Sequence, residues 1–317
     1  MFTSYIPGGA DSAILSKSLR EKSAPTIKAK PLRGRAIFKI AGVSAFALHG
    51  TAFGQANTPE LQSAPLSAWQ AHNRSILVGF DLLDRHYTEF DSLGLTPDGI
   101  LDSEKGTLKG ETIRGRWQGA PLGESHSQVF VQGEYRRHRR HTGSTSYQGY
   151  LQSGSTFTPY TATTQNELHD FRIRVGIPLA QTESAQWVPF IEYRYQNWVR
   201  DLVQYRETFQ HHAGVIGVLG QWRASPAWTV EGEAAAGSTL RARIDAPQFG
   251  FSATLPNRAL WTVGVSASYL IAKQWNAVAA IRHEQSRYGQ SAASNGFFEP
   301  ESRTKQTRTL LGIEYQL

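Results

Sequence analysis

The 317-residue chain contains no cysteine, which excludes disulfides, thiolate metal sites and a cysteine nucleophile. Its net charge of +7 is a poor argument for nucleic-acid binding, because residues 1–56 contain eight basic and two acidic residues and the remainder is close to neutral. No run of 18 apolar residues occurs, so the sequence predicts no transmembrane helix.

The first segment has the pattern of an export signal. Basic residues precede an apolar stretch at 40–48, and small residues follow it as far as Gly54-Gln55-Ala56. This order predicts a signal peptide over residues 1–56 with a long basic region and cleavage after Ala56. The alternatives are an amphipathic helix of the mature protein and a later start of translation. We expect residues 57–73 to form a periplasmic N-terminal tail.

From residue 75 onward, ten segments alternate apolar with polar residues, as in a strand with one face in an apolar medium and one in a polar medium. Between 171 and 175, for example, Phe171, Ile173 and Val175 alternate with two arginines. The predicted strands are 75–90, 107–118, 128–137, 168–179, 187–197, 213–222, 228–237, 259–272, 275–288 and 303–317.

The connections between these segments alternate in length. Those near 119–127, 180–186, 223–227 and 273–274 are short, whereas those near 91–106, 138–167, 198–212, 238–258 and 289–302 are long. Bacterial outer-membrane barrels have short periplasmic turns, long external loops and an even number of strands. We therefore predict an all-β protein, a single antiparallel transmembrane β-barrel of ten strands over residues 74–317. Eight or twelve strands remain alternatives.

Tryptophans provide an independent indication of the membrane boundary. Each of five lies beside a proposed short turn and shares the parity of the apolar face of its strand. An indole is stabilised at the headgroup level, where its ring meets hydrocarbon and its N–H meets water. The residues predicted at the membrane interface are Trp117, Trp187, Trp222, Trp228 and Trp275.

The opposite parity collects eight acids and eight arginines. Since buried charges must pair and a small barrel is filled by side chains, this balance predicts a cross-linked plug in the lumen. A narrow conducting pore is the alternative. The predicted lumen charges are Asp81, Arg85, Arg114, Arg116, Glu134, Asp170, Arg172, Arg174, Glu192, Arg194, Glu231, Glu233, Arg282, Glu284, Arg308 and Glu314.

Several short motifs resemble an omptin-like outer-membrane barrel family of proteobacteria and chlamydiae. They are YTEFD at 87–91, LDSEKG at 101–106 with Gly110, YQG at 147–149, WVR at 198–200 and YRE at 205–207. The overall plan is similar to ten-stranded outer-membrane barrels, of which the omptin proteases are the enzymatic branch. The resemblance spans most of 74–317 and implies architecture, since most members of that family lack an assigned activity. The chain ends in Leu317 instead of the usual Phe, but Tyr315 and the alternation fit a carboxy-terminal assembly signal.

Two groups of residues are candidates for a site. The omptin-type Asp-x-Asp-Trp motif is absent, and the candidates for an acid–histidine pair at the external rim are Asp84, His86, His169 and Asp170. The cluster of arginines at 136, 137, 139 and 140 is a candidate for binding lipopolysaccharide phosphates or another polyanion. The alternative for each group is a solvated or paired set of surface residues. The ligand candidates are Arg136, Arg137, Arg139 and Arg140.

The sequence therefore predicts an integral protein of the bacterial outer membrane without a cofactor or metal. The expected role is non-enzymatic, with a charge-plugged lumen and external loops for surface interaction or a structural role. A narrow porin-like channel for small polar solutes is one alternative, and an omptin-like surface protease is another. The expected partners are outer-membrane lipid, lipopolysaccharide and the barrel assembly machinery, which would recognise the C-terminal strand. Nucleic acid is not expected as a partner.

Overall fold

The computed structural model describes residues 67–120, 128–139, 144–153, 156–179, 181–202, 205–294 and 297–317. The predicted signal peptide, residues 57–66 of the predicted tail, and Arg140 lie outside these ranges. No helix in the described part of the chain is long and apolar enough to cross a membrane.

The described chain is almost entirely β-structure. A short helix, α1 (Ala68–His72), precedes the first strand, and one turn of 3-10 helix, η2 (Pro247–Phe249), follows the eighth. The strands are β1 (Ser75–Phe90), β2 (Ile100–Gly119), β3 (Val129–His138), β4 (Ser144–Ser153), β5 (Thr156–Gly176), β6 (Ala185–Leu202), β7 (Tyr205–Arg223), β8 (Trp228–Ala246), β9 (Phe251–Leu255), β10 (Ala259–Ala272), β11 (Trp275–Tyr288) and β12 (Ser302–Gln316).

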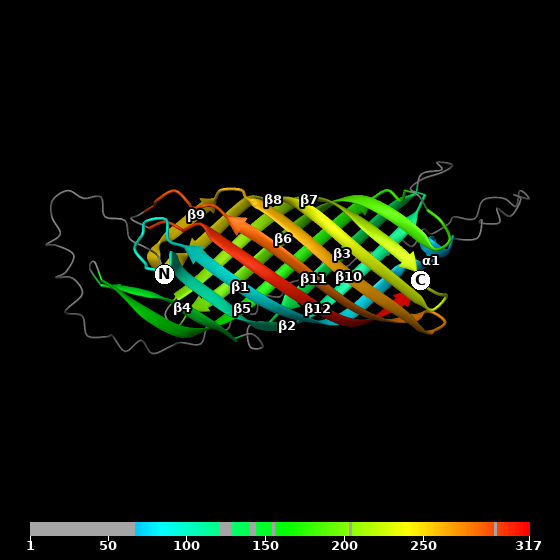
Figure 1. Ribbon diagram of the computed structural model, residues 1–317, viewed down its shortest axis with the longest axis horizontal. Coiled ribbons are helices and arrows are strands. Elements are labelled where there is room, and N and C mark those ends of the chain that lie inside the picture. Colours follow the sequence, from blue (N-terminus) through cyan, green and yellow to red (C-terminus); the bar gives the residue numbers. More distant parts are fainter. Residues whose placement is uncertain are drawn as a thin grey trace, which may run out of the picture. The chain divides into compact units, whose positions relative to one another are not determined.

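Ten of these strands close into an antiparallel barrel. β1 pairs with β2 on one side and with β12 on the other, and every other neighbour follows in chain order once β4 and β9 are set aside. Figure 1 shows the strands crossing the barrel at a steep tilt, with the C-terminal β12 beside β1. The predicted fold class and the ten-stranded count are confirmed.

The strands extend further toward the loop end than the sequence predicted. β1, β10 and β11 have the predicted bounds, but β6 and β7 leave only residues 203–204 between them, where a long loop was expected. The reason is that backbone pairing continues beyond the apolar band. There the outward side chains become polar, so the alternation of apolar with polar residues ends while the strand does not.

Two extra strands occupy parts of the predicted long loops. β9 pairs with the last residues of β8. β4 forms a hairpin with the first half of β5 and also pairs with β2 over Asp102–Lys105. Since β3 ends at His138, β4 takes its place between β2 and β5 toward the loop end.

The outer surface carries a broad apolar band. Large outward side chains such as Ile216, Ile191 and Val78 are 61–69% exposed, which is unusual for isoleucine and valine in water. The five predicted interface tryptophans all face outward near the short turns and are 39–55% exposed. This arrangement is the one that a barrel with lipid around it requires.

Candidate functional site

The short-turn end of the barrel is closed by α1 and a group of amides. A capping box between Ser67 and Gln70 starts this helix, and the buried Trp69 donates to the Thr182 backbone carbonyl at 2.7 Å. Asn73 then donates to Gln118 at 2.7 Å and to Gln221 at 2.9 Å. Thus residues 67–73, within the segment expected to be a tail, pack onto the end of the barrel.

Above the amides, charged side chains from eight strands fill the lumen. Arg174 bridges Glu192 at 2.7 Å and Glu233 at 2.8 Å, and comparable bridges connect twelve of the charges to one another. Arg114 with Glu314 and Arg116 with Glu231 are separate pairs in the same lumen. All of these residues are buried or nearly so, which matches the rule that interior charges occur in pairs. Together they are called the ionic network: Asp81, Arg114, Arg116, Glu134, Arg136, Asp170, Arg172, Arg174, Glu192, Arg194, Glu231, Glu233, Arg282, Glu284, Arg308 and Glu314.

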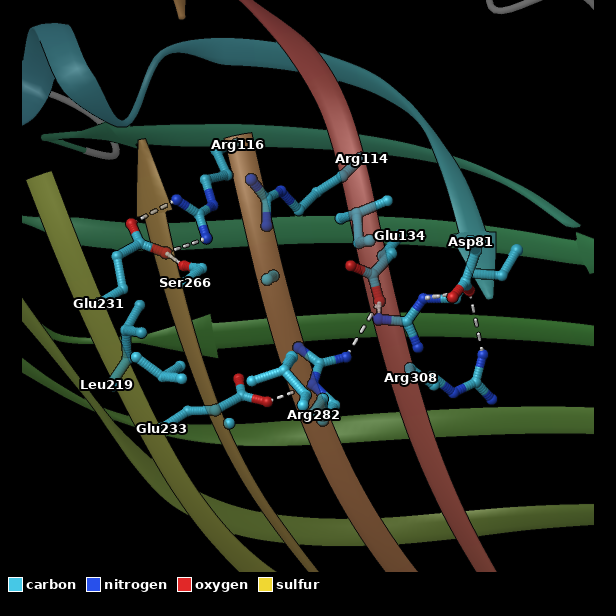
Figure 2. A pocket seen from close by; sticks show the side chains of 17 residues that line it. Asp81, Arg114, Arg116, Glu134, Leu219, Glu231, Glu233, Ser266, Arg282 and Arg308 are labelled. Atoms are coloured by element: carbon cyan, nitrogen blue, oxygen red, sulfur yellow. Dashed lines mark hydrogen bonds and ion pairs between the residues drawn. The ribbon is translucent and has the colours of Figure 1, made fainter. Parts of the chain in front are cut away.

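Little space remains inside this network. Figure 2 shows the cavity at its centre, with Arg116 paired to Glu231 on one side and Arg308 beside Asp81 on the other. The volume of the cavity is about 40 Å³. About 10–15 Å³ is needed for one water, so the cavity accommodates a few waters and is too small for a hydrated solute.

Arg136 belongs to the lumen and not to the external surface. Its guanidinium contacts Glu134 and lies 3.7 Å from Asp81, and the side chain is 6% exposed. The sequence grouped it with the outward arginines because the four lie together in the chain. Strand alternation instead points Arg136 inward, while Arg137 and Arg139 face outward and pair with Glu167 and Glu111.

A second closure, formed by aromatic and aliphatic residues, lies between the network and the loop end. Trp198 stacks on Phe209 with ring centroids 4.7 Å apart, and Phe209 stacks on Tyr288 at 6.4 Å. Leu83 and Leu108 pack against the same rings, and each is 0% exposed. We call this group the aromatic layer: Leu83, Tyr87, Leu108, Leu168, Trp198, Phe209, Ala242, Ile244, Ala246, Phe251, Leu255 and Tyr288.

Arg85 lies within the aromatic layer, between Leu83 and Tyr87 on the inward face of β1. Its guanidinium is 3.6 Å from the centroid of the Trp198 ring, and no oxygen of the described residues accepts a hydrogen bond from it. A buried guanidinium without acceptors is costly, and contact with the face of an indole offsets part of that cost. Arg85 therefore belongs with the aromatic layer and not with the ionic network in which the sequence placed it.

Beyond the aromatic layer, at the loop end, lies a group of buried acids around Arg200. This arginine is 3.0 Å from Asp102, 3.1 Å from Glu104 and 3.4 Å from Glu207. Tyr87 is within 2.9 Å of Glu89 and 3.0 Å of Glu299. These six charged residues, Glu89, Asp102, Glu104, Arg200, Glu207 and Glu299, are called the vestibule cluster, and all are at most 3% exposed.

Three acids of the vestibule cluster, Glu89, Glu207 and Glu299, hold protons more tightly than isolated carboxyls do. After Leu82 the next outward residues of β1 are the exposed Asp84 and His86, so Glu89, which follows them, is outside the membrane band. Burial, followed by repulsion from Asp102, raises the pKa of Glu89 to about 8. Burial and the neighbouring Glu89 likewise raise the pKa of Glu299 well above its usual range. The Tyr87 hydroxyl can donate only one hydrogen bond, although both Glu89 and Glu299 lie within reach of it. This geometry fits a protonated carboxyl on one of the two glutamates, which then donates to the Tyr87 oxygen.

The predicted catalytic residues do not converge. Asp84 and His86 are exposed on the outer face of β1, and Asp170 is buried in the lumen network. His169 points outward from β5, where Tyr135 lies 2.8 Å from one ring nitrogen and Glu167 lies 3.0 Å from the other. Because β2 and β3 separate β1 from β5, these groups cannot act on one substrate atom. Among the described residues, no cluster of His, Asp and Glu suited to a metal occurs.

A row of cations crosses the outer face just beyond the apolar band. Lys105 of β2 and Lys305 of β12 are the register partners of His86, and Arg303 of β12 is opposite Arg287 of β11. Partial burial, then Lys105 and Lys305, lower the pKa of His86. Like charges opposite each other destabilise a sheet, so this arrangement favours a bound anion. Residues Lys105, Lys305, Arg287 and Arg303 form what we call the basic row.

The sequence analysis missed the aromatic layer, the vestibule cluster and the basic row. Parity was an available signal, because Trp198, Arg200 and Glu207 share the inward parity of their strands. The strand ends were placed too early for this parity to be applied to them. The register that brings Lys105 and Lys305 to either side of His86 is a property of strand pairing alone.

Comparison with known proteins supports the fold and no more. No family model matches the chain, and no curated protein matches it. Among solved structures, the outer-membrane protease OmpT from Escherichia coli aligns with a TM-score of 0.52 and 11% identity, covering 77% of this chain and 97% of OmpT. The translocator domain of the autotransporter NalP from Neisseria meningitidis aligns with a TM-score of 0.38 and 10% identity, covering 78% and 91%. The alignment with OmpT shows that the chain has the fold of an omptin-like outer-membrane β-barrel, as the sequence motifs implied.

Proposed function

We propose that this protein is a non-conducting, non-enzymatic barrel of the bacterial outer membrane whose external end binds partners at the cell surface. In this proposal the chain is exported by a signal peptide cleaved after Ala56, and the barrel assembly machinery recognises β12. The closure of the lumen at two successive levels is the observation that supports the proposal. A pore needs a continuous aqueous path, and both the ionic network and the aromatic layer oppose one.

The measurement that tests closure is single-channel conductance of the refolded barrel in planar bilayers. The wild-type protein should show no stepwise current at either polarity. Steady open steps in the wild-type trace would favour the narrow porin-like channel instead.

A protease is the less favoured alternative, because the acid and histidine candidates do not meet at one point. If the wild-type barrel cleaved a peptide library and Asp84→Ala or His86→Ala abolished that cleavage, the protease function would be favoured instead.

Lipopolysaccharide is the proposed lipid partner, and the basic row is the surface proposed to bind its phosphates. Hydrocarbon occupies about 30 Å of a bilayer and the headgroups most of the next several ångströms. Long lysine and arginine side chains just beyond the apolar band reach that zone. The structure gives no carboxylate partner to Lys105 or Lys305 among the described residues, so phosphate is the missing counter-charge. Arg137 and Arg139, in contrast, already have carboxylate partners.

Binding of lipopolysaccharide to the purified barrel tests the basic row. The double variant Lys105→Ala with Lys305→Ala should bind about tenfold more weakly than the wild type, or weaker still. This difference in affinity should be smaller at high salt, because salt screens the phosphate contacts of the wild type. Lys273→Ala is the matched control, since Lys273 is exposed in the β10–β11 turn at the opposite end. Equal binding by the double variant and the control would remove the basic row as the site.

A further inference from the structure

The hairpin of β4 and β5 extends past the strands around it. β5 pairs with β4 from Thr156 to Gln165, but its pairing with β6 begins only at Gln165, opposite Asp201. In Figure 1 this hairpin projects beyond the neighbouring strands at the loop end. Within the described chain, therefore, the segment of β5 from Thr158 to Thr164 has a strand on one edge and none on the other.

This open edge has no charged residue to protect it, and Pro159 is its one blocked position. Edge strands are commonly blocked by inward charges, by lysine or by proline, which keep other strands away. Residues 144–165 contain no Asp, Glu, Lys, Arg or His, and six of the 22 are threonine. On the outer face of β5, Thr161 and Thr163 are exposed. Apart from Pro159, no side chain of the open edge therefore repels an approaching strand.

Pro159 indicates which backbone groups face the open edge. A proline cannot donate to a ladder, so within a sheet it occupies a position whose nitrogen points away from the paired strand. Pro159 is opposite Tyr150 of β4, so its nitrogen is assigned to the other edge. Because backbone direction repeats every two residues, Thr161 and Thr163 present their N–H and C=O groups on the same open edge.

We infer that the Thr158–Thr164 edge of β5 is a docking site for an extended, uncharged peptide strand of a partner protein. The strand adds antiparallel to β5, in the place that β6 occupies lower in the sheet. A row of unpaired amides and carbonyls is matched by another backbone, and the lack of charge excludes selection of ionic ligands. This inference names the partner class for the surface role proposed above and rests on that role.

The sequence of β4 supplies the probe. β4 is the strand of this molecule that pairs with β5 along Thr156–Gln165, and its sequence is uncharged, so it has the extended and uncharged character that we infer for the partner strand. A fluorescent peptide with the sequence of residues 144–153 is titrated with the full-length refolded barrel in detergent. We expect saturable binding and new protection of the Thr161 and Thr163 amides from hydrogen exchange.

Two variants and one modified peptide decide the mode of binding. Thr161→Pro with Thr163→Pro removes two donors of the open edge and should weaken binding at least tenfold, whereas Thr161→Ser with Thr163→Ser should leave it unchanged. The same peptide N-methylated at consecutive residues, so that neither of its edges keeps its donors, should not bind the wild-type barrel, a result that does not depend on the folding of any variant.

Absence of saturable binding, or binding that survives N-methylation, would overturn the inference. A wild-type barrel that dimerises without peptide and becomes monomeric in the proline variant would assign the edge to a second copy, and would also overturn it. Conductance separates the two proposals. If the peptide does not bind, the proposal of a closed lumen is unaffected. If the lumen conducts, the result of the peptide experiment is unaffected.

Discussion

Arg200 illustrates how single residues hold the loop end of the barrel together. It lies within 3.5 Å of four carboxylates, and its side chain is fully buried. Removing one partner from a buried ionic cluster leaves the other charges uncompensated, which costs more than the pair contributed. The stability of the vestibule cluster therefore depends on this guanidinium more than on any one acid.

Replacement of Arg200 by glutamine should lower the free energy of unfolding by about 3–5 kcal/mol. The matched control is Arg243→Gln, because Arg243 is 57% exposed and pairs with Asp245 at 2.8 Å. An exposed pair contributes less than about 1 kcal/mol. Urea unfolding of the two variants in the same detergent is the measurement. Equal losses would mean that Arg200 is not the centre of the cluster.

The raised pKa of Glu89 predicts a pH dependence of stability. A glutamate that titrates at about 8 in the folded state, against 4.5 as the ordinary value, binds more protons folded than unfolded between those pH values. Stability should therefore fall as the pH rises from about 4.5 to about 8. Glu89→Gln should flatten this slope, whereas Glu183→Gln, in an exposed turn, should not. An unchanged slope in Glu89→Gln would contradict the assignment.

Strands are continuous across two environments. β7 begins beyond the apolar band with Thr208 and Gln210, then crosses the band with Ile216 before reaching Trp222 at the short-turn interface. Ile216 is six residues from Trp222, or about 20 Å along the strand. With the strand tilted, this places Ile216 near the middle of the hydrocarbon.

The cost of an outward arginine should depend on its depth along β7. Ile216→Arg is expected to destabilise the inserted barrel by about 2–4 kcal/mol, and Gln210→Arg by about 0–1 kcal/mol. Unfolding from lipid vesicles measures both. If the two substitutions cost the same, the outer face of β7 does not lie in hydrocarbon.

The lumen of the barrel is filled at two levels, and different interactions hold each level together. The ionic network is held by paired charges, and the aromatic layer is held by stacked rings and aliphatic packing. The two levels follow one another on the same strands: on β6, Arg194 belongs to the network and Trp198 to the layer. We therefore expect either level by itself to block ions.

Opening the lumen should therefore require changes at both levels. Trp198→Ala with Phe209→Ala should remain non-conducting, because the network below is intact. Arg172→Ala with Arg194→Ala should also remain closed. Combining all four substitutions should produce measurable single-channel steps, provided that heat-modifiable migration shows a folded barrel. Conductance in the first double variant would mean that the network is permeable.

Much of this architecture follows from local alternation of side chains. The period of two in Phe171, Ile173 and Val175 gives the strand and its faces without knowledge of its neighbours, and the interface tryptophans and inward charges follow from the same parity. Hence the barrel, its ten strands and most lumen residues were predictable. The hairpin of β4 was not, because its Ser, Thr and Tyr residues carry no apolar alternation.

Which side chains meet is a matter of ring closure and register. Arg136 lies 3.7 Å from Asp81 of β1 and does not face an external anion, Arg85 stacks on Trp198, and Lys105 and Lys305 flank His86 of β1. Each of these contacts joins strands that are distant in the chain or depends on the stagger between neighbours. Alternation along one strand determines the face of a residue, whereas its height and its partners are set by long-range pairing of the closed sheet.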